Sequence, residues 1–258
     1  MSFRLKMDAS ARSAESNIIL ALDLPPDRPH QLLQRSLRIF ELASPHICAV
    51  KINRQLLLPL GLFKGVEEIV KLAHQHDLPA IMDCKINDVG HTNRSIAENY
   101  YHAGFDAVIA NPFVGWEGGL QPVFDAAREL KRGVILLVYM SHKGAFEGYG
   151  QTVLDAETKT LKRQYLVFAR KAVSWKADGA VVGATYTEKI AELHGILGDE
   201  VPIYSPGVGT QGGSVNSAIK AGARFLIVGR SITLAKDPSE AARHVQEEAN
   251  RCLTRLRS

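Results

Sequence analysis

Residues 80–88 read Ala-Ile-Met-Asp-Cys-Lys-Ile-Asn-Asp, a short apolar run that ends in a cluster of charged side chains. An uninterrupted apolar run of this length is typical of a parallel strand that is buried on both faces. Similar runs recur along the whole chain, and seven of the eight are followed by a stretch with helical periodicity. The eight runs are Ile18–Leu22, Ile47–Val50, Ala80–Met82, Ala107–Ala110, Val134–Met140, Ala180–Val182, Val201–Tyr204 and Phe225–Val228.

Eight strand–helix units in about 240 residues, joined by right-handed crossovers, predict an α/β fold with a single (β/α)8 TIM barrel. A doubly wound sheet is the alternative, because the pattern does not show whether the sheet closes. We expect the last helix at 238–256, and an inserted loop at 143–160 before a helix at 161–176. Residues 1–16 lack the apolar stretch of a signal peptide and are expected to form a polar, loose arm. The catalytic barrel domain would then cover 17–258.

The charge balance excludes some classes of protein. The chain has 258 residues with 31 basic and 27 acidic side chains, which suits a basic pocket for a small anion better than nucleic-acid binding. Its three cysteines (Cys48, Cys84 and Cys252) lack metal-site spacing and favour a reducing, cytoplasmic location. No apolar run approaches the roughly 18 residues of a membrane span. His74 and His76 lie on a polar helix face, where we expect them to be solvated. We therefore predict no metal, nucleic-acid or membrane partner.

Charged residues follow the first three runs, at the strand ends where barrels place their catalytic groups. Asp23 and Lys51 follow the first two runs, and Asp83 and Lys85 follow the third. Positions two apart on a strand share a face, so Asp83 and Lys85 should point inward and Cys84 outward, into the core. A buried acid beside a buried lysine keeps both groups ionised. The pair could serve catalysis or simply hold the barrel together as a core ion pair.

A glycine-rich segment, 205–213, follows the seventh run and contains a G-x-G-x-x-G pattern. A dinucleotide site would require this pattern in the first βαβ unit and an acid after the next strand. Here the next strand ends in Gly229 and Arg230 instead. Glycines after strand seven and Gly-Arg after strand eight predict a phosphate cradle, in which Arg230 binds the anion bidentately.

In these residues and several others, the chain resembles the orotidine 5′-phosphate decarboxylase family over nearly its whole length. The resemblance rests on seven pieces that occur in the same order, each at a strand end. They are Leu22-Asp23-Leu24, Lys51, Asp83-x-Lys85-x-x-Asp88, Thr92, Met140-Ser141-His142, Ser205-Pro206-Gly207-Val208-Gly209 with Gln211-Gly212-Gly213, and Val228-Gly229-Arg230-Ser231.

The resemblance implies a lyase that converts orotidine 5′-phosphate to uridine 5′-phosphate, the last step of de novo pyrimidine biosynthesis, without metal or organic cofactor. Lys85 would protonate C6 of the pyrimidine, Asp83 and Asp88 would face the leaving carboxylate, and Lys51 would complete the catalytic array. Asp88 and Thr92 would reach across a homodimer to the ribose of the neighbouring site. The implied substrate-binding positions are Asp23, Lys51, Thr92, Ser141, Pro206, Gly207, Gln211, Gly212, Gly229 and Arg230.

Two other functions share parts of this pattern. Sugar-phosphate enzymes of the hexulose-phosphate synthase and ketogulonate-phosphate decarboxylase type use Mg²⁺ and need an acid after the second strand. Lys51 stands there, and a lysine beside Asp83 would repel a divalent cation. A non-catalytic nucleotide-phosphate-binding barrel would need the phosphate cradle, but not Lys85 with both flanking acids.

Overall fold

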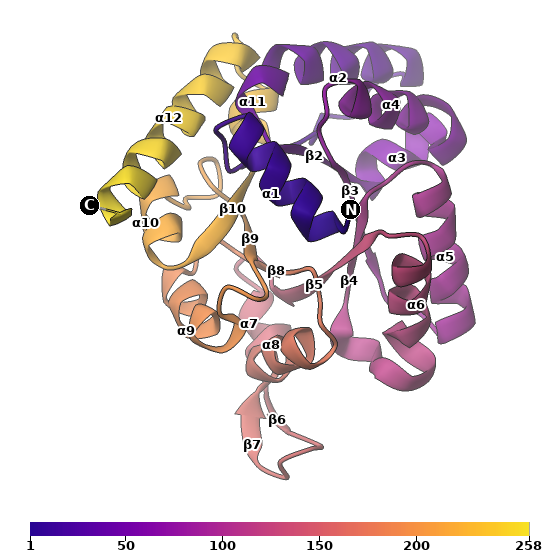
Figure 1. The fold of residues 1–258 in the computed structure, drawn as a ribbon, viewed down its shortest axis with the longest axis vertical. Coiled ribbons are helices and arrows are strands. Elements are labelled where there is room, and N and C mark those ends of the chain that lie inside the picture. Colours follow the sequence, from indigo (N-terminus) through magenta and orange to yellow (C-terminus); the bar gives the residue numbers. More distant parts are fainter. Residues whose placement is uncertain (258) are drawn as a thin grey trace.

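The computed structural model describes residues 1–257, and its core is a closed barrel of eight parallel strands (Figure 1). The barrel closes where the first strand pairs with the last, with Ile18 opposite Leu226. Each predicted run overlaps one of these strands, so the TIM barrel is confirmed and the doubly wound alternative is wrong. The strands are β1 (Ile18–Ala21), β2 (Ala49–Asn53), β3 (Ala80–Ile86), β4 (Ala107–Ala110), β5 (Gly133–Tyr139), β8 (Gly179–Val182), β9 (Ile203–Pro206) and β10 (Ala223–Val228).

Helices surround the barrel, and alternating side chains divide the apolar core into two layers. In β1, Ile19 and Ala21 point into the barrel, whereas Ile18 and Leu20 pack against the helices. None of the helices within residues 1–257 combines the length and apolar character that a membrane span requires. The surrounding helices are α2 (Pro29–Ala43), α3 (Arg54–Leu60), α4 (Glu67–Gln75), α5 (Gly90–His102), α6 (Gln121–Glu129), α8 (Gln164–Ser174), α9 (Thr187–Leu197), α10 (Val215–Lys220), α11 (Arg230–Thr233) and α12 (Pro238–Arg257).

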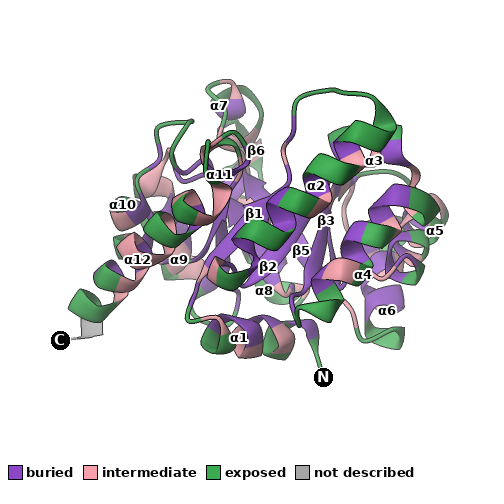
Figure 2. Cartoon of the chain, turned by 90° about the horizontal axis from the view of Figure 1, so that it is seen from above, coloured by how far each residue is buried: buried purple, intermediate pink, exposed green. Residues whose placement is uncertain are grey.

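The N-terminal segment is a helix, α1 (Phe3–Ser13), so the expectation of a loose arm is wrong. Figure 2 shows α1 across one end of the strands, with α7 (Ala145–Tyr149) and α11 at the opposite end. Phe3 and Met7 are each 1% exposed and complete the inner core at the amino-terminal end of the barrel. A side chain at Gly133 would clash with the Phe3 ring, so glycine is required there. The end of the predicted catalytic domain, Ser258, lies outside the described residues.

The segment 143–160, expected to be a loop, contains α7 and most of a hairpin of β6 (Thr152–Leu154) and β7 (Leu161–Arg163). The hairpin projects from the barrel beside α8 (Figure 1). Its turn is held by Asp155, whose carboxylate accepts hydrogen bonds from the backbone N–H groups of Glu157 and Thr158 and pairs with Lys162 at 2.5 Å. β7 also takes the first three residues of the predicted 161–176 helix, so α8 begins later.

Candidate active site

Three of the predicted residues meet at the carboxyl-terminal end of the barrel. Asp83 Oδ2 lies 2.8 Å from Lys51 Nζ, and Asp83 Oδ1 lies 2.6 Å from Lys85 Nζ. The inward direction predicted for Asp83 and Lys85 is therefore confirmed. Lys51 is only 5% exposed, so its charge is stable only because Asp83 compensates it. The arrangement is a carboxylate held between two ammonium groups.

The charges of this cluster reinforce one another. Burial opposes the charged form of Lys51, but the charges of Asp83 and Asp23 outweigh burial and raise the pKa of the ammonium. Burial would likewise raise the pKa of Asp83, but the charges and hydrogen bonds of Lys51 and Lys85 lower it from 3.8 to about 2. Lys51 and Asp83 are thus both charged at neutral pH. A fixed array of this kind can stabilise a charge that develops on a bound molecule.

The backbone is strained where Lys85 leaves the barrel wall. Lys85 has φ of +50°, a left-handed conformation that is unusual for a residue with a side chain. Met82 pairs with Val108 and Ile86 with Ala110, so β3 advances by four residues over the length in which β4 advances by two. This bulge carries Asp83 and Lys85. Such strain costs about 1–3 kcal/mol and concentrates at functional sites, which favours a functional role over a simple core ion pair.

Asp23 lies beside this array at the end of β1, and Asn53 is a member of the site that the sequence reasoning missed. Asn53 Nδ2 donates to Asp23 Oδ1 at 2.6 Å, while Asn53 Oδ1 accepts from the N–H of Leu56 and caps α3. Asn53 stands two positions after Lys51 on the same strand. The two-residue period that paired Asp83 with Lys85 could therefore have found it.

Ser141, Gly207 and Gln211 gather on the other side of the barrel mouth. A side chain at Gly207 would lie 2.9 Å from Gln211 Oε1 and 3.1 Å from Ser141 Cβ. Gly183, at the end of β8, also packs directly against Ser141. The backbone carbonyl of Pro206 accepts from the N–H of Ala184 at 2.7 Å. The structure therefore brings Ser141, Pro206, Gly207 and Gln211 together at this part of the barrel mouth.

The glycine-rich segment folds back on itself and meets the end of β10. Gly209 donates to the Gly213 carbonyl at 2.9 Å, and Gly212 donates to the Gly209 carbonyl at 2.7 Å. Gly209 and Gly212 both have positive φ, and a side chain at Gly209 would clash with Ser231.

The residues after β10 bring an arginine to the same place. A side chain at Gly229 would lie 2.9 Å from Asp23 Oδ2, so β10 ends beside the first strand. Arg230 is exposed, and among residues 1–257 its guanidinium makes no ion pair or side-chain hydrogen bond. A cation without a protein partner beside an open glycine loop is well suited to bind an anionic group.

Asp88 and Thr92 do not join the array within the chain. Asp88 is exposed, and its carboxylate accepts a hydrogen bond from the N–H of Val89 at 2.7 Å. No ion pair links it to Lys85 within the described part of the chain. Thr92 is partly buried in the first turn of α5. The structure therefore unites Lys51, Asp83 and Lys85 and leaves the fourth charged residue on the rim.

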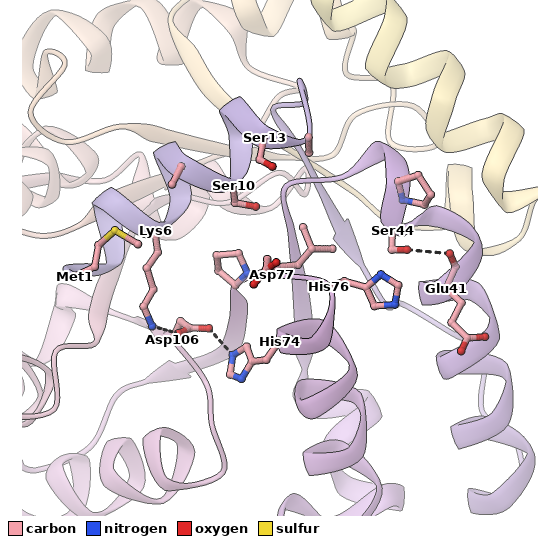
Figure 3. A pocket seen from close by; sticks show the side chains of 15 residues that line it. Met1, Lys6, Ser10, Ser13, Glu41, Ser44, His74, His76, Asp77 and Asp106 are labelled. Atoms are coloured by element: carbon pink, nitrogen blue, oxygen red, sulfur yellow. Dashed lines mark hydrogen bonds and ion pairs between the residues drawn. The ribbon is translucent and has the colours of Figure 1, made fainter.

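A cavity of about 920 Å³ lies at the opposite end of the barrel, beside α1 (Figure 3). Asp106, just before β4, lies 2.8 Å from Lys6 Nζ, 2.9 Å from His74 Nε2 and 2.9 Å from Arg132. His74 is exposed, as expected, and its ring also makes a hydrogen bond to Asp106. Within residues 1–257, no group of three or more His, Cys, Asp or Glu side chains could hold a metal ion.

Cys84 points away from the barrel interior, as predicted, and is 4% exposed within the outer core. Burial raises the pKa of its thiol to about 12. A thiol in this environment is protonated at neutral pH and is a poor nucleophile. Cys84 is therefore a packing residue.

The comparisons with known proteins agree with this geometry. Residues 16–245 match the model of the orotidine 5′-phosphate decarboxylase / HUMPS family. The chain belongs to this family. Orotidine 5′-phosphate decarboxylase of Thermococcus kodakarensis is 37% identical over 234 residues, covering 91% of this chain and 97% of the relative. That of Methanosarcina acetivorans is 36% identical over 231 residues, covering 90% and 93%.

Solved structures extend the likeness to three dimensions. The orotidine 5′-monophosphate decarboxylase of Methanocaldococcus jannaschii, complexed with the inhibitor BMP, has a TM-score of 0.75 and 28% identity. The match covers 90% of this chain and 98% of that chain. Leishmania donovani OMP decarboxylase, at 23% identity, shares the fold with a TM-score of 0.84 and 98% coverage of both chains.

Proposed function

We propose that this protein decarboxylates orotidine 5′-phosphate to uridine 5′-phosphate, the last step of de novo pyrimidine synthesis, without a metal or organic cofactor. The observation that carries the proposal is the ion-paired Lys51–Asp83–Lys85 array on a strained strand end. Family membership and relatives of that name at about 36% identity support the substrate. The three cysteines are free and buried, which suits a reducing compartment such as the cytoplasm.

Loss of CO2 from C6 of the pyrimidine leaves a carbanion with no conjugated electron sink. Stabilisation must then come from charges that are already in place. Lys85 provides an ammonium whose position is fixed by Asp83 at 2.6 Å. We assign to Lys85 the transfer of a proton to C6 as the carboxylate leaves. Asp83, kept ionised by Lys51, holds Lys85 and places negative charge beside the departing group.

The remaining residues bind the parts of the substrate that do not react. Gln211, Gly229 and Arg230 would hold the phosphate, with Pro206, Gly207 and Gly212 forming the backbone around it. Ser141 would contact the pyrimidine, and Asp23 with Lys51 the ribose hydroxyls. Binding energy from a distant phosphate can be used at the reacting centre, because it offsets the cost of ordering the site.

Lys51 argues against the magnesium-dependent sugar-phosphate enzymes within the same family description. The Lys51 ammonium lies 2.8 Å from Asp83. An enzyme that binds a divalent ion here would need a carboxylate at position 51 instead. A turnover assay tests both proposals. Purified protein is given orotidine 5′-phosphate with and without EDTA, and uridine 5′-phosphate is measured. We expect turnover that EDTA leaves unchanged. Absence of product rejects the decarboxylase, and EDTA-sensitive activity restored by Mg²⁺ rejects the metal-free mechanism.

We further propose that the protein is a homodimer in which Asp88 and Thr92 serve the partner's site. Asp88 is exposed on the rim and unpaired with its own Lys85, which fits a group that acts outside its own chain. Mixing Asp88→Ala with Lys85→Ala subunits tests the arrangement. Each heterodimer would contain one intact site, so a random mixture should regain about a quarter of wild-type activity. If Asp88 served its own chain, no site would be intact and mixing would restore nothing.

A further inference from the structure

Asn93, in the first turn of α5, has a pattern of hydrogen bonds directed at one neighbour. Its Oδ1 accepts from the backbone N–H of Asp88 at 2.9 Å, and its Nδ2 donates to the backbone carbonyl of Asp88 at 2.5 Å. Asn93 is 0% exposed, whereas Asp88 is exposed. One buried amide thus holds both backbone polar groups of Asp88 and leaves the carboxylate at the surface.

The same amide ties the Asp88 segment to a second, well-packed segment. Asn93 Nδ2 also donates to the carbonyl of Gly119 at 3.0 Å. Gly119 belongs to η4 (Trp116–Leu120), and the Trp116 ring packs 5.2 Å from that of Trp175. A side chain at Gly90 would lie 3.0 Å from the backbone of Gly118. The start of α5 and η4 are therefore in close backbone contact, with Asn93 joining them.

Local helix formation does not explain an asparagine at this position. Asparagine is a poor residue for a helix interior, because its amide competes for backbone hydrogen bonds. An aspartate could accept from the Asp88 N–H but could not donate to either carbonyl. Only a side chain with both a donor and an acceptor at this distance can make all three bonds.

We propose that Asn93 is a positioning residue that fixes Asp88 for use in the active site of the partner subunit. This inference rests on the proposed decarboxylation and the shared site. Displacing a catalytic group by about 1 Å can lower a rate about 100-fold. Asn93→Ala should therefore lower kcat by about that factor. Asn99→Ala is the matched control, because Asn99 lies on the same helix, is exposed and bonds only to the Ser95 carbonyl at 2.9 Å.

Subunit mixing separates positioning from a general structural effect. If Asn93 acts through Asp88 across the interface, its lesion affects the partner's site. Asn93→Ala mixed with Lys85→Ala should then regain about a quarter of wild-type activity, whereas Asn93→Ala mixed with Asp88→Ala should regain nothing. If Asn93 instead supports its own chain's site, the two results are reversed. That reversal would overturn the proposal.

Further controls distinguish a failure of the Asn93 proposal from a failure of the decarboxylase or shared-site proposals on which it rests. A wild-type protein without turnover rejects the decarboxylase, and a failed Asp88→Ala plus Lys85→Ala mixture rejects the shared site. Asn93→Asp is a second variant of nearly the same shape, which loses both donated bonds and should give the same mixing pattern. Melting temperatures of both variants are compared with wild type. If neither variant folds, Asn93 is required for the fold and the positioning role is rejected.

Discussion

The barrel carries a largely buried carboxylate at each end, and each is paired with two or more basic side chains. Asp83 at the carboxyl-terminal end lies between Lys51 and Lys85, both of which extend from the barrel strands. Asp106 at the amino-terminal end also accepts a backbone hydrogen bond, from Ala80 at 3.0 Å. The side chains around Asp106 are Lys6, Arg132 and the ring of His74.

The two clusters differ in the parts of the fold that their side chains connect. The side-chain partners of Asp106 come from α1, the end of α4 and the segment before β5, so Asp106 connects separate parts of the fold. Asp83 connects only neighbouring strands and lies on the bulge of β3. Both carboxyl groups have a pKa lowered from 3.8 to about 2. A perturbed pKa alone therefore does not identify an active site, and the unpaired arginine beside the glycine-rich loop distinguishes the end where we propose one.

Removing one lysine from each cluster should give the largest contrast. Lys85→Ala removes the proposed proton donor, so we expect kcat to fall about 10⁴-fold. Lys6→Ala also removes a lysine that pairs with a buried acid, because Lys6 Nζ lies 2.8 Å from Asp106 Oδ1. This pair lies at the amino-terminal end of the barrel, where we propose no reaction. We expect Lys6→Ala to leave kcat unchanged. Steady-state assays of both variants test this, and equal losses of activity would remove the functional distinction between the two clusters.

The two arginines offer a contrast of intermediate size. Arg230 has no side-chain partner among residues 1–257, whereas Arg132 pairs with Asp106 at 2.9 Å. Two charge-assisted hydrogen bonds to phosphate are worth about 3–5 kcal/mol. Arg230→Ala should therefore lower kcat/KM by about 10²–10⁴-fold, through both kcat and KM, without changing the melting temperature.

Arg132→Ala is the control for this effect. It should lower the melting temperature and leave KM unchanged, because Arg132 lies away from the proposed phosphate cradle. An Arg230→Ala variant with wild-type KM for orotidine 5′-phosphate would show that the phosphate binds elsewhere.

The smallest effect is expected for the stability contribution of Asp106. Lowering its pKa from 3.8 to about 2 corresponds to about 2 kcal/mol of folding free energy at neutral pH. Asp106→Asn should lower the free energy of unfolding by about that amount and leave kcat unchanged. Asp8→Asn is the control, because the Asp8–Arg224 pair on the same end is largely exposed and should contribute under about 1 kcal/mol.

The pH dependence of the Asp106 effect follows from the direction of its pKa shift. A carboxyl group whose pKa is lowered by folding stabilises the protein above its unfolded-state pKa and loses that effect on acidification. The difference between wild type and Asp106→Asn should be full above about pH 4 and decrease as the pH falls towards 2. Urea unfolding at several pH values measures it. A difference that persists at pH 2 would assign the effect to packing.

The sequence predicted the barrel because its signal is local and repeated. Each buried strand is an uninterrupted apolar run, and the residue after it marks the functional end. The prediction failed for α1 because that helix has only a narrow apolar stripe, with Phe3, Met7 and Ala11 buried. A narrow stripe is sufficient to cover a barrel end, but it is too weak to stand out in a polar segment.

Within the site, the sequence predicted residue types better than backbone detail. The period of two found the Asp83–Lys85 pair, but no local pattern predicts a left-handed lysine or the bulge in β3. The roles of Asn93 and His74 depend on partners brought together by folding, at Gly119 and Asp106. The role that we propose for Asp88 requires a second chain, which the folding of one chain does not supply.

The contacts of α1 also set an order of events for folding. Lys6 pairs with Asp106, Asp8 with Arg224, and β1 closes the barrel on β10, more than 200 residues away in sequence. Contacts this distant must overcome a large loss of chain entropy before they stabilise the fold. Helix α1, which is synthesised before the barrel strands, thus finds its complete binding surface only after β10 has been synthesised. Until then β1 has an unpaired edge, which exposes the nascent chain to wrong strand pairing.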